Sequence, residues 1–176
     1  MLTTDIMHYF GIEHDWEAVG FYETAHHRQL MTNVRNAIHA GRLVAITGPT
    51  GVGKTLTLNR LQSALVAEGK IIVARSLSIE KPRLVLSSLV TALFLDVSDD
   101  LEAKVPTQPE KRERLLQEMI RKRKKPVALF CDEAHDLHGS TLTGLKRLME
   151  IVQAGGGLLS VVLVGHPKLR NDLNRP

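Results

Sequence analysis

The chain has 176 residues, of which 43% are hydrophobic and 24% are charged, a balance typical of one globular domain. Its 23 Lys and Arg residues outnumber its 19 Asp and Glu residues, and the net charge of +4 permits a polyanionic partner such as nucleic acid. The absence of a long apolar run and of a signal-peptide pattern predicts a cytoplasmic protein without a membrane span, and a single cysteine excludes an intrachain disulfide.

Four short apolar runs predict the strands of a parallel sheet. Each is nearly continuous, which is the pattern of strands that are buried on both faces. The four runs are LVAIT at 43–47, IIVAR at 71–75, VALFC at 127–131 and LSVVLV at 159–164. Helical patterns lie between them, and this alternation predicts a three-layer α/β/α sandwich with right-handed crossovers.

A helix is predicted after the first strand and the glycine-rich segment that follows it. It begins near Lys54, and leucines at positions 58, 61 and 65 recur at helical spacing along it. Gly69 is placed to end this helix, because glycine readily adopts the left-handed conformation that follows a helix C-terminus.

Two further helices are predicted from their starting signals. TQPE at 107–110 has the form of a capping box, in which Thr107 would pair with Glu110. Ser140 is expected to cap the last of the predicted helices, which the three glycines at 155–157 would end. Both helices carry apolar stripes that would face the sheet.

The segment GPTGVGKT at 48–55 predicts a phosphate-binding loop, the alternative being a glycine-rich turn that binds nothing. It matches G-x-x-x-x-G-K-[ST] and lies between a predicted strand and a predicted helix, the context that this motif requires. Lys54 is expected to contact the β- and γ-phosphates and the Thr55 hydroxyl to bind Mg²⁺. The residues expected to bind the nucleotide are Gly48, Pro49, Thr50, Gly51, Val52, Gly53, Lys54, Thr55 and Leu56.

Two carboxylates follow the third predicted strand, in PVALFCDEAHDL at 126–137. Asp132 and Glu133 would lie at the carboxyl end of the strand, where ligands bind in open α/β sheets. Asp132 is suited to hold Mg²⁺ through water, and Glu133 to polarise the attacking water; the alternative is a carboxylate pair that merely caps a loop. Cys131, inside the strand, is interpreted as core packing rather than as a nucleophile.

A histidine follows the fourth predicted strand, in LLSVVLVGHPKLRNDL at 158–173. There, His166 could contact both the γ-phosphate and the attacking water, or it could be a loop histidine ahead of Pro167 without such a role. The predicted catalytic residues are therefore Glu133, Lys54 and His166, and the predicted magnesium ligands are Thr55 and Asp132.

Taken together, these segments resemble the AAA+ ATPases, with Walker A at 48–55, Walker B at 127–133 and a sensor-1-like position at 166. More narrowly, they look like the general-secretion-pathway A-type ATPases and the related ATP-binding subunits of bacterial transposons. This likeness rests on FYETAHHRQLMTNVRNAIHAGRLVAITGPTGVGKTLTLNRL, LFCDEAHDL and VVLVGHPKLRNDL, and it covers essentially the whole chain. It implies Mg²⁺-dependent ATP hydrolysis by a homo-oligomer.

The resemblance also implies how the chain is organised. Residues 1–30 would contribute to the adenine pocket, chiefly through the segment from Val19 to Arg28, and residues 31–176 would form the ATPase core. Relatives continue with a further strand and a helical lid, whereas this chain stops at NRP, 174–176. The chain is therefore expected to be truncated before the lid and to hydrolyse ATP weakly.

Several cations are further candidates for function. By the resemblance, a neighbouring subunit supplies an arginine or lysine for hydrolysis, and Arg147, Arg170 and Arg175 are the candidates. The segment KRERLLQEMIRKRKK at 111–125 contains eight basic and two acidic residues. It would bind DNA without sequence preference, or it would form only a solvated helix end.

Three functions are considered for such a chain. The favoured one is an ATP-hydrolysing regulator that assembles on double-stranded DNA and recruits a transposase-like partner. The alternative is a secretion-type ATPase that remodels an envelope complex. A small-molecule P-loop kinase is disfavoured, because DEAH at 132–135 is typical of water activation.

Overall fold

The computed structural model describes residues 23–76, 85–98 and 104–174, together with Ile6, His8, Tyr9 and Gly11. The chain splits into two compact units, Met1–Leu30 and Met31–Pro176, and the fold described here is that of the larger unit. The segment expected to contact adenine belongs to the smaller unit, and residues 19–22 of it lie outside the described residues. Among the described helices, none combines the length and the apolar character needed to cross a bilayer.

Four parallel strands form the sheet of the larger unit. They are β1 (Leu43–Thr47), β2 (Ile72–Arg75), β3 (Val127–Cys131) and β4 (Leu159–Gly165), in the spatial order β1-β4-β3-β2. All three pairings between neighbouring strands are parallel. The observed strands coincide with the four predicted apolar runs to within one residue at each end, so the predicted parallel sheet is confirmed.

Burial distinguishes the two central strands from the two outer ones. Every residue of β3 and β4 is buried, as predicted for strands covered on both faces. In β1, by contrast, Ala45 and Thr47 are exposed, and in β2 Arg75 is exposed. The expectation of complete burial is therefore wrong for the outer strands, each of which has a neighbouring strand on one side only among the described residues.

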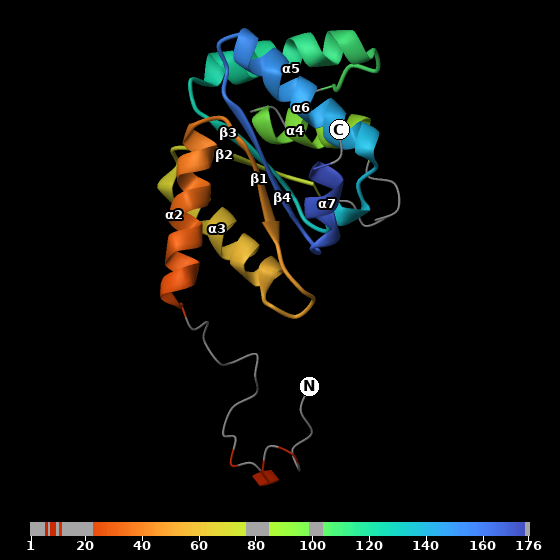
Figure 1. The fold of residues 1–176 in the computed structure, drawn as a ribbon. Coiled ribbons are helices and arrows are strands. Elements are labelled where there is room, and N and C mark those ends of the chain that lie inside the picture. Colours follow the sequence, from red (N-terminus) through yellow and green to blue (C-terminus); the bar gives the residue numbers. More distant parts are fainter. Residues whose placement is uncertain are drawn as a thin grey trace. The chain divides into compact units, whose positions relative to one another are not determined.

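Helices cover both faces of the sheet (Figure 1). The helices are α2 (Ala25–His39), α3 (Lys54–Glu68), α4 (Leu86–Val97), α5 (Pro109–Arg123), α6 (Gly139–Ala154) and α7 (Lys168–Leu173), with a 3₁₀ turn η2 (Ala134–Asp136). One layer contains α3 and the part of α2 after residue 30, where the Ser160 hydroxyl of β4 donates to the Ile38 carbonyl. The opposite layer contains α4, α5, α6 and α7, which share one hydrophobic cluster with the sheet. The predicted three-layer α/β/α sandwich is thereby confirmed.

The first predicted helix ends as expected. Leu58, Leu61 and Leu65 of α3 are buried, and Gly69 has a φ of 63°. Its N–H group donates to the carbonyls of Leu65 and Val66, which satisfies two groups that a helix C-terminus leaves without partners.

The predicted caps of the two later helices are wrong. Helix α5 begins at Pro109 after Gln108, so Thr107 lies outside the helix and no side chain caps it. Helix α6 is capped by His138, whose Nδ1 accepts from the Ser140 N–H at 3.2 Å. Proline at the first helical position and a preceding imidazole acceptor therefore replace the expected hydroxyl caps.

Candidate functional site

The loop between β1 and α3 is shaped by two glycines. Gly51 and Gly53 both have a φ of 82°, and no atom lies within 4 Å of where a Cβ would be at either position. The requirement is therefore conformational rather than steric, because this backbone geometry is strained for residues that carry a Cβ. Gly53 directly precedes α3, whose first N–H groups and dipole favour an anion at this point.

Lys54 extends back across this loop. Its Nζ donates to the Pro49 carbonyl at 2.9 Å, which holds the ammonium above the turn. The loop itself is joined to β4, because the Gly48 N–H donates to the Gly165 carbonyl at 3.2 Å. The ammonium and the glycine turn thus form one cationic surface that is anchored to the sheet.

A hydrogen bond joins the start of α3 to the end of β3. The Thr55 hydroxyl donates to Oδ2 of Asp132 at 2.9 Å, although the two residues are 77 positions apart. The second carboxylate oxygen of Asp132 accepts from the Glu133 N–H at 2.9 Å. Hydroxyl and carboxylate oxygens in contact are the kind of ligands that Mg²⁺ prefers.

Thr55 and Asp132 fit a magnesium ion that takes the rest of its shell from elsewhere. Among the described residues, no group of three or more His, Cys, Asp or Glu side chains is placed to hold a metal. Mg²⁺ commonly uses only one or two protein oxygens, and it keeps waters or phosphate oxygens at its other positions. The donor set therefore fits an ion that arrives with a nucleotide.

The backbone turns sharply at Glu133. This residue has a φ of 51°, a conformation that is uncommon for a non-glycine residue, and it directly precedes η2. The turn follows the last buried residue of β3 and brings the carboxylate to the edge of the same cavity as Lys54. The Glu133 side chain is partly buried.

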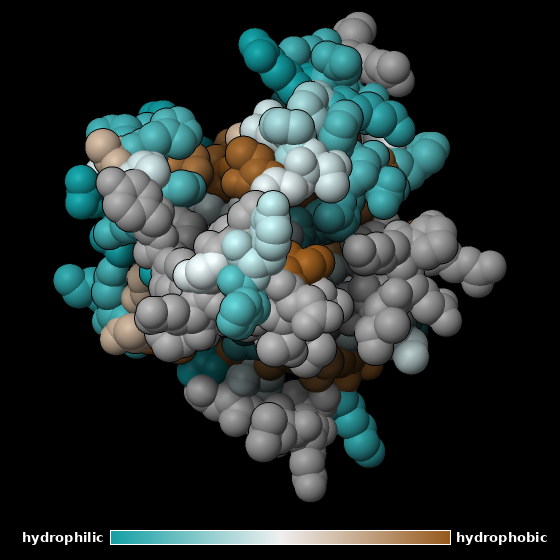
Figure 2. Space-filling model, turned by 90° about the horizontal axis from the view of Figure 1, so that it is seen from below, coloured by the Kyte–Doolittle hydropathy of each residue, from teal (hydrophilic) through white to brown (hydrophobic). Residues whose placement is uncertain are grey.

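One cavity of about 460 Å³ collects most of the predicted site residues. We call it the P-loop cavity, and its lining consists of Thr50, Gly51, Gly53, Lys54, Thr55, Leu56, Glu133, His135 and His166. Gly48, Pro49 and Val52 are in the loop without lining the cavity, and Asp132 reaches it through Thr55. All three predicted catalytic side chains are therefore placed together. Figure 2 shows the molecule from below, and the coloured residues around the outline of that view are mainly hydrophilic.

His135 also lines this cavity, although no sequence motif considered above assigns it a role. Its Nδ1 lies 3.4 Å from Oε2 of Glu133 and 3.3 Å from the backbone nitrogen of His166. The His135 and His166 rings are 6.0 Å apart between centroids. In the sequence, the only indication of a role is the presence of a histidine in DEAH. No pattern in the neighbouring residues indicates that His135 contacts His166, 31 positions away.

Cys131 does not contribute chemistry to the cavity. It is completely buried in the hydrophobic cluster on the α4–α6 side of the sheet, and this burial raises the pKa of its thiol to about 12. A thiol that stays neutral is a poor nucleophile, so the interpretation of Cys131 as core packing is supported.

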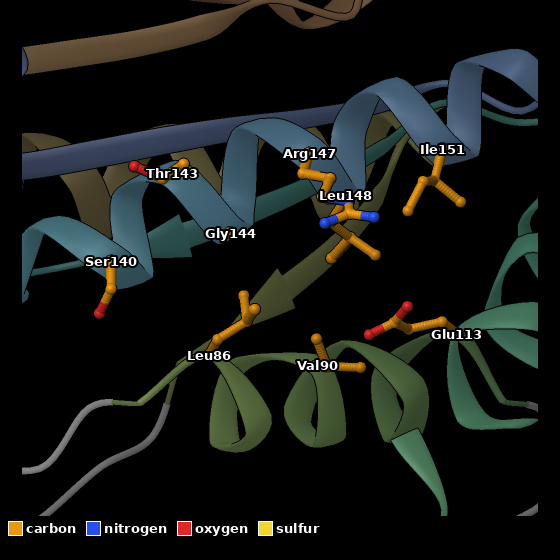
Figure 3. Close-up of a pocket in the computed structure, with 9 residues that line it drawn as sticks. All are labelled: Leu86, Val90, Glu113, Ser140, Thr143, Gly144, Arg147, Leu148 and Ile151. Atoms are coloured by element: carbon orange, nitrogen blue, oxygen red, sulfur yellow. The ribbon is translucent and has the colours of Figure 1, made fainter. Parts of the chain in front are cut away.

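Arg147 lies in a second cavity, of about 390 Å³, which we call the α4–α6 cavity. Its lining consists of Leu86, Val90, Glu113, Ser140, Thr143, Gly144, Arg147, Leu148 and Ile151. Figure 3 shows Leu86 and Val90 on α4 pointing toward Leu148 and Ile151 on α6, with Arg147 beside Leu148 and Glu113 across the gap from α6. Of the other two arginines proposed as trans-acting, Arg170 is exposed on α7 and Arg175 lies outside the described residues.

The basic segment at 111–125 is partly used by the fold. Arg123 donates from Nε to the Val97 carbonyl at 3.0 Å, and Lys125 donates to the Gly69 carbonyl at 2.8 Å. Lys122 pairs with Glu118 one helical turn away, at 2.8 Å. The exposed basic residues of the segment for which the structure gives no such contact are Lys111, Arg114, Arg121 and Lys124.

Comparison with known proteins gives a family and a fold. The family described as AAA domain matches residues 36–173. Cdc6p from Pyrobaculum aerophilum is similar with a TM-score of 0.60 and 17% identity, over 90% of this chain and 46% of that one. A chain in the structure of Drosophila ORC bound to AT-rich DNA and Cdc6 gives 0.56 and 13%, over 85% and 49%. The Aeropyrum pernix ORC2 protein, in ADPNP–ADP complexes, gives 0.55 and 15%, over 86% and 44%.

The chain thus spans less than half the length of each of these similar structures. At such low sequence identities, the similarity establishes the fold alone. The activities of those proteins are not assigned to this chain by it. A search among curated protein sequences finds no match.

Proposed function

This chain belongs to the AAA domain family, and from that premise we propose that it binds and hydrolyses Mg²⁺–ATP to control its assembly on double-stranded DNA. The observation that carries the proposal is the 2.9 Å hydrogen bond between Thr55 and Asp132. It joins the phosphate-binding loop to the carboxylate strand, beside Lys54 and Glu133 in the same cavity.

Each polar group of the P-loop cavity has a role in this proposal. The Lys54 ammonium and the N–H groups at the start of α3 bind phosphate oxygens, while Thr55 and Asp132 hold the metal ion. The ion, when bound, neutralises charge on the phosphate oxygens. Glu133 accepts a hydrogen bond from the attacking water and orients it, and His166 contacts the terminal phosphate from the end of β4.

The open edge of the sheet supports assembly into a homo-oligomer. Among the described residues, β1 pairs with β4 on one side only, and its Ala45 and Thr47 are exposed. Such an edge favours association with further polypeptide. In the proposed cycle, ATP bound in the P-loop cavity favours the assembled form, and hydrolysis through Glu133 reverses it.

Double-stranded DNA is proposed as the ligand of the assembled form. Lys111, Arg114, Arg121 and Lys124 are exposed along α5 and its end, where they can neutralise phosphates without reading sequence. One of the similar structures is of a complex bound to AT-rich DNA. A transposase-like protein as the recruited partner rests on the sequence resemblance alone.

Calorimetry with ATP tests the nucleotide part of the proposal. We expect heat of binding for the wild-type chain with ATP and Mg²⁺, and Asp132→Asn should weaken the dependence of that binding on Mg²⁺. Lys146→Ala, an exposed lysine of α6, serves as a matched control and should bind as the wild type does. A wild-type chain that gives no heat with Mg²⁺–ATP would exclude the proposal.

A salt series tests the DNA part separately. Affinity for double-stranded DNA should rise with ATP and fall steeply with salt, because phosphate contacts release counterions. Glu133→Gln should keep the chain on DNA after ATP is added, since it binds nucleotide without hydrolysing it. DNA affinity that responds to neither ATP nor salt would contradict the DNA role and leave the ATPase proposal standing.

A further inference from the structure

His135 is positioned between the two predicted catalytic groups that come from different strands. Its Nδ1 is 3.4 Å from Oε2 of Glu133, at the end of β3, and accepts the N–H of His166, after β4, at 3.3 Å. The other ring nitrogen, Nε2, is 3.7 Å from Oδ1 of Asp136. The Glu133 carboxylate and the backbone N–H of His166 therefore both lie close to the same ring nitrogen of His135.

These two contacts require opposite states of that nitrogen. Toward the Glu133 carboxylate, Nδ1 must carry a proton and donate, because an ionised carboxylate only accepts. Toward the His166 N–H, Nδ1 must present its lone pair, because an amide N–H only donates. A single ring nitrogen satisfies one of these partners at a time, so the two contacts exclude each other.

The backbone keeps the ring close to both partners. A Cβ at Gly165 would lie 3.1 Å from the backbone nitrogen of His135 and 3.2 Å from Nδ1, so the end of β4 packs directly against this residue. Gly165 is buried, and its carbonyl accepts the Gly48 N–H of the phosphate-binding loop. The end of β4 thus limits the His135 ring on the side where the His166 N–H lies.

We propose that His135 is a positioning residue that holds either the Glu133 carboxylate or the His166 backbone, and so couples the loop after β4 to the residue that orients the attacking water. When Nδ1 donates to Glu133, the carboxylate is fixed beside the cavity. When Nδ1 accepts from His166, the carboxylate loses this contact and with it the orientation that the contact imposes. This inference rests on the proposed ATP hydrolysis, but the exchange of partners does not require turnover.

The state of the ring can be measured without nucleotide. In a chain with ¹⁵N-labelled histidine, two-bond proton–nitrogen spectra at about pH 8.5 show which ring nitrogen carries the proton. We expect two exchanging states in the wild type, with Nδ1 protonated in part of the population, and in Glu133→Ala we expect the proton on Nε2 alone, because Nδ1 would accept only from His166. His135→Asn assigns the signal, and His39→Ala, at the exposed end of α2, is the matched histidine control. The same protonation of Nδ1 in both chains would overturn the proposal.

Kinetics test the consequence for Glu133. His135→Ala should lower kcat about tenfold, because the carboxylate loses its orientation, while the Kd for ATP stays unchanged. His135→Asn should restore most of the activity, since a carboxamide can donate to Glu133 and accept from His166 at once. Thermal melts of both variants establish that each is folded.

The outcomes separate this inference from the proposed function. Equal kcat values for His135→Ala and the wild type, or equal losses for the alanine and asparagine variants, would overturn the positioning role. A wild-type chain without ATP turnover would contradict the ATPase proposal, whereas the histidine spectra would still decide how Nδ1 is shared.

Discussion

The two cavities of the larger unit have comparable volumes, about 460 and 390 Å³, but they are built differently. The P-loop cavity lies at the carboxyl ends of parallel strands, and loops and helix starts from three separate segments line it. The α4–α6 cavity is lined by side chains on the bodies of three helices, with Leu86, Val90, Leu148 and Ile151 as its apolar part.

The difference shows that cavity volume alone does not indicate chemistry. At the strand ends, backbone N–H groups, a helix dipole, an ammonium and two carboxylates converge, because parallel strands deliver every following loop to the same edge. On the helix bodies, the backbone groups are already paired within each helix, so only side chains can act. Arg147 and Glu113 are the charged groups of that second lining.

The largest expected effect in the P-loop cavity comes from Glu133→Gln. Loss of the carboxylate that is proposed to orient and polarise water should lower ATP turnover by about 10²–10⁴-fold. Nucleotide binding should remain, because the phosphate contacts come from Lys54 and the loop. Steady-state phosphate release and calorimetry measure the two effects. Turnover in Glu133→Gln similar to that of the wild type would assign water activation to another residue.

A second comparison uses one cation from each cavity. Lys54→Ala should weaken ATP binding by about 10–100-fold, since a hydrogen bond to a charged group contributes about 1.5–3 kcal/mol. Arg147→Met, in the α4–α6 cavity, should leave the ATP affinity of the isolated chain unchanged. Calorimetry on both variants checks the contrast, and equal losses would mean that the two cavities communicate.

Alanine substitutions at two glycines should affect the stability of the protein differently. Gly165→Ala should lower the free energy of unfolding by about 1–3 kcal/mol, because the new Cβ would meet the backbone of His135 and Ala134. At Gly144 in α6 the atoms nearest to a Cβ belong to the side chain of Leu86, the first of them at 2.5 Å, and the end of that side chain can move. The helix also gains about 1 kcal/mol from alanine there, so Gly144→Ala should change stability little. Urea unfolding of both variants makes the comparison, and a larger loss for Gly144→Ala would contradict it.

The smallest expected effect concerns Cys131, which is buried beside both regions. Its pKa is raised by burial from the ordinary value of 9.0 to about 12, so the folded chain keeps the thiol neutral where the unfolded chain ionises it. Stability from this group is complete below pH 9.0 and declines as the pH rises above it. Urea unfolding between about pH 8 and 10 should show this decline in the wild type and not in Cys131→Ala. A folded chain whose Cys131 reacts quickly with a thiol reagent would contradict the burial.

Local sequence patterns determined much of this molecule. The four strands follow from runs of apolar residues, and α3 follows from the spacing of its leucines and from Gly69. The glycine-rich loop before α3, a predicted phosphate-binding loop, follows from its glycines and Lys54, because φ preferences and motif spacing act between near neighbours. These features need no knowledge of which strand lies beside which.

Which residues cap the helices, and which basic side chains the fold uses, depends on contacts that local sequence patterns do not reveal. Gln108 and His138 precede their helices although hydroxyl residues were available nearby. Arg123 and Lys125 bind carbonyls of distant residues, so part of the basic segment belongs to the fold rather than to a ligand. Charge counted along the sequence does not distinguish these two uses.

The role inferred for His135 depended on the tertiary structure alone. Strands β3 and β4 pair in parallel register with Cys131 opposite Leu163, and this pairing brings the turn after β3 against the end of β4. His135 and His166 become neighbours only through that register. No periodic pattern in the sequence indicates which residues of β3 and β4 pair. The sequence therefore determined which residues could act on a phosphate, and strand pairing decided which of them touch.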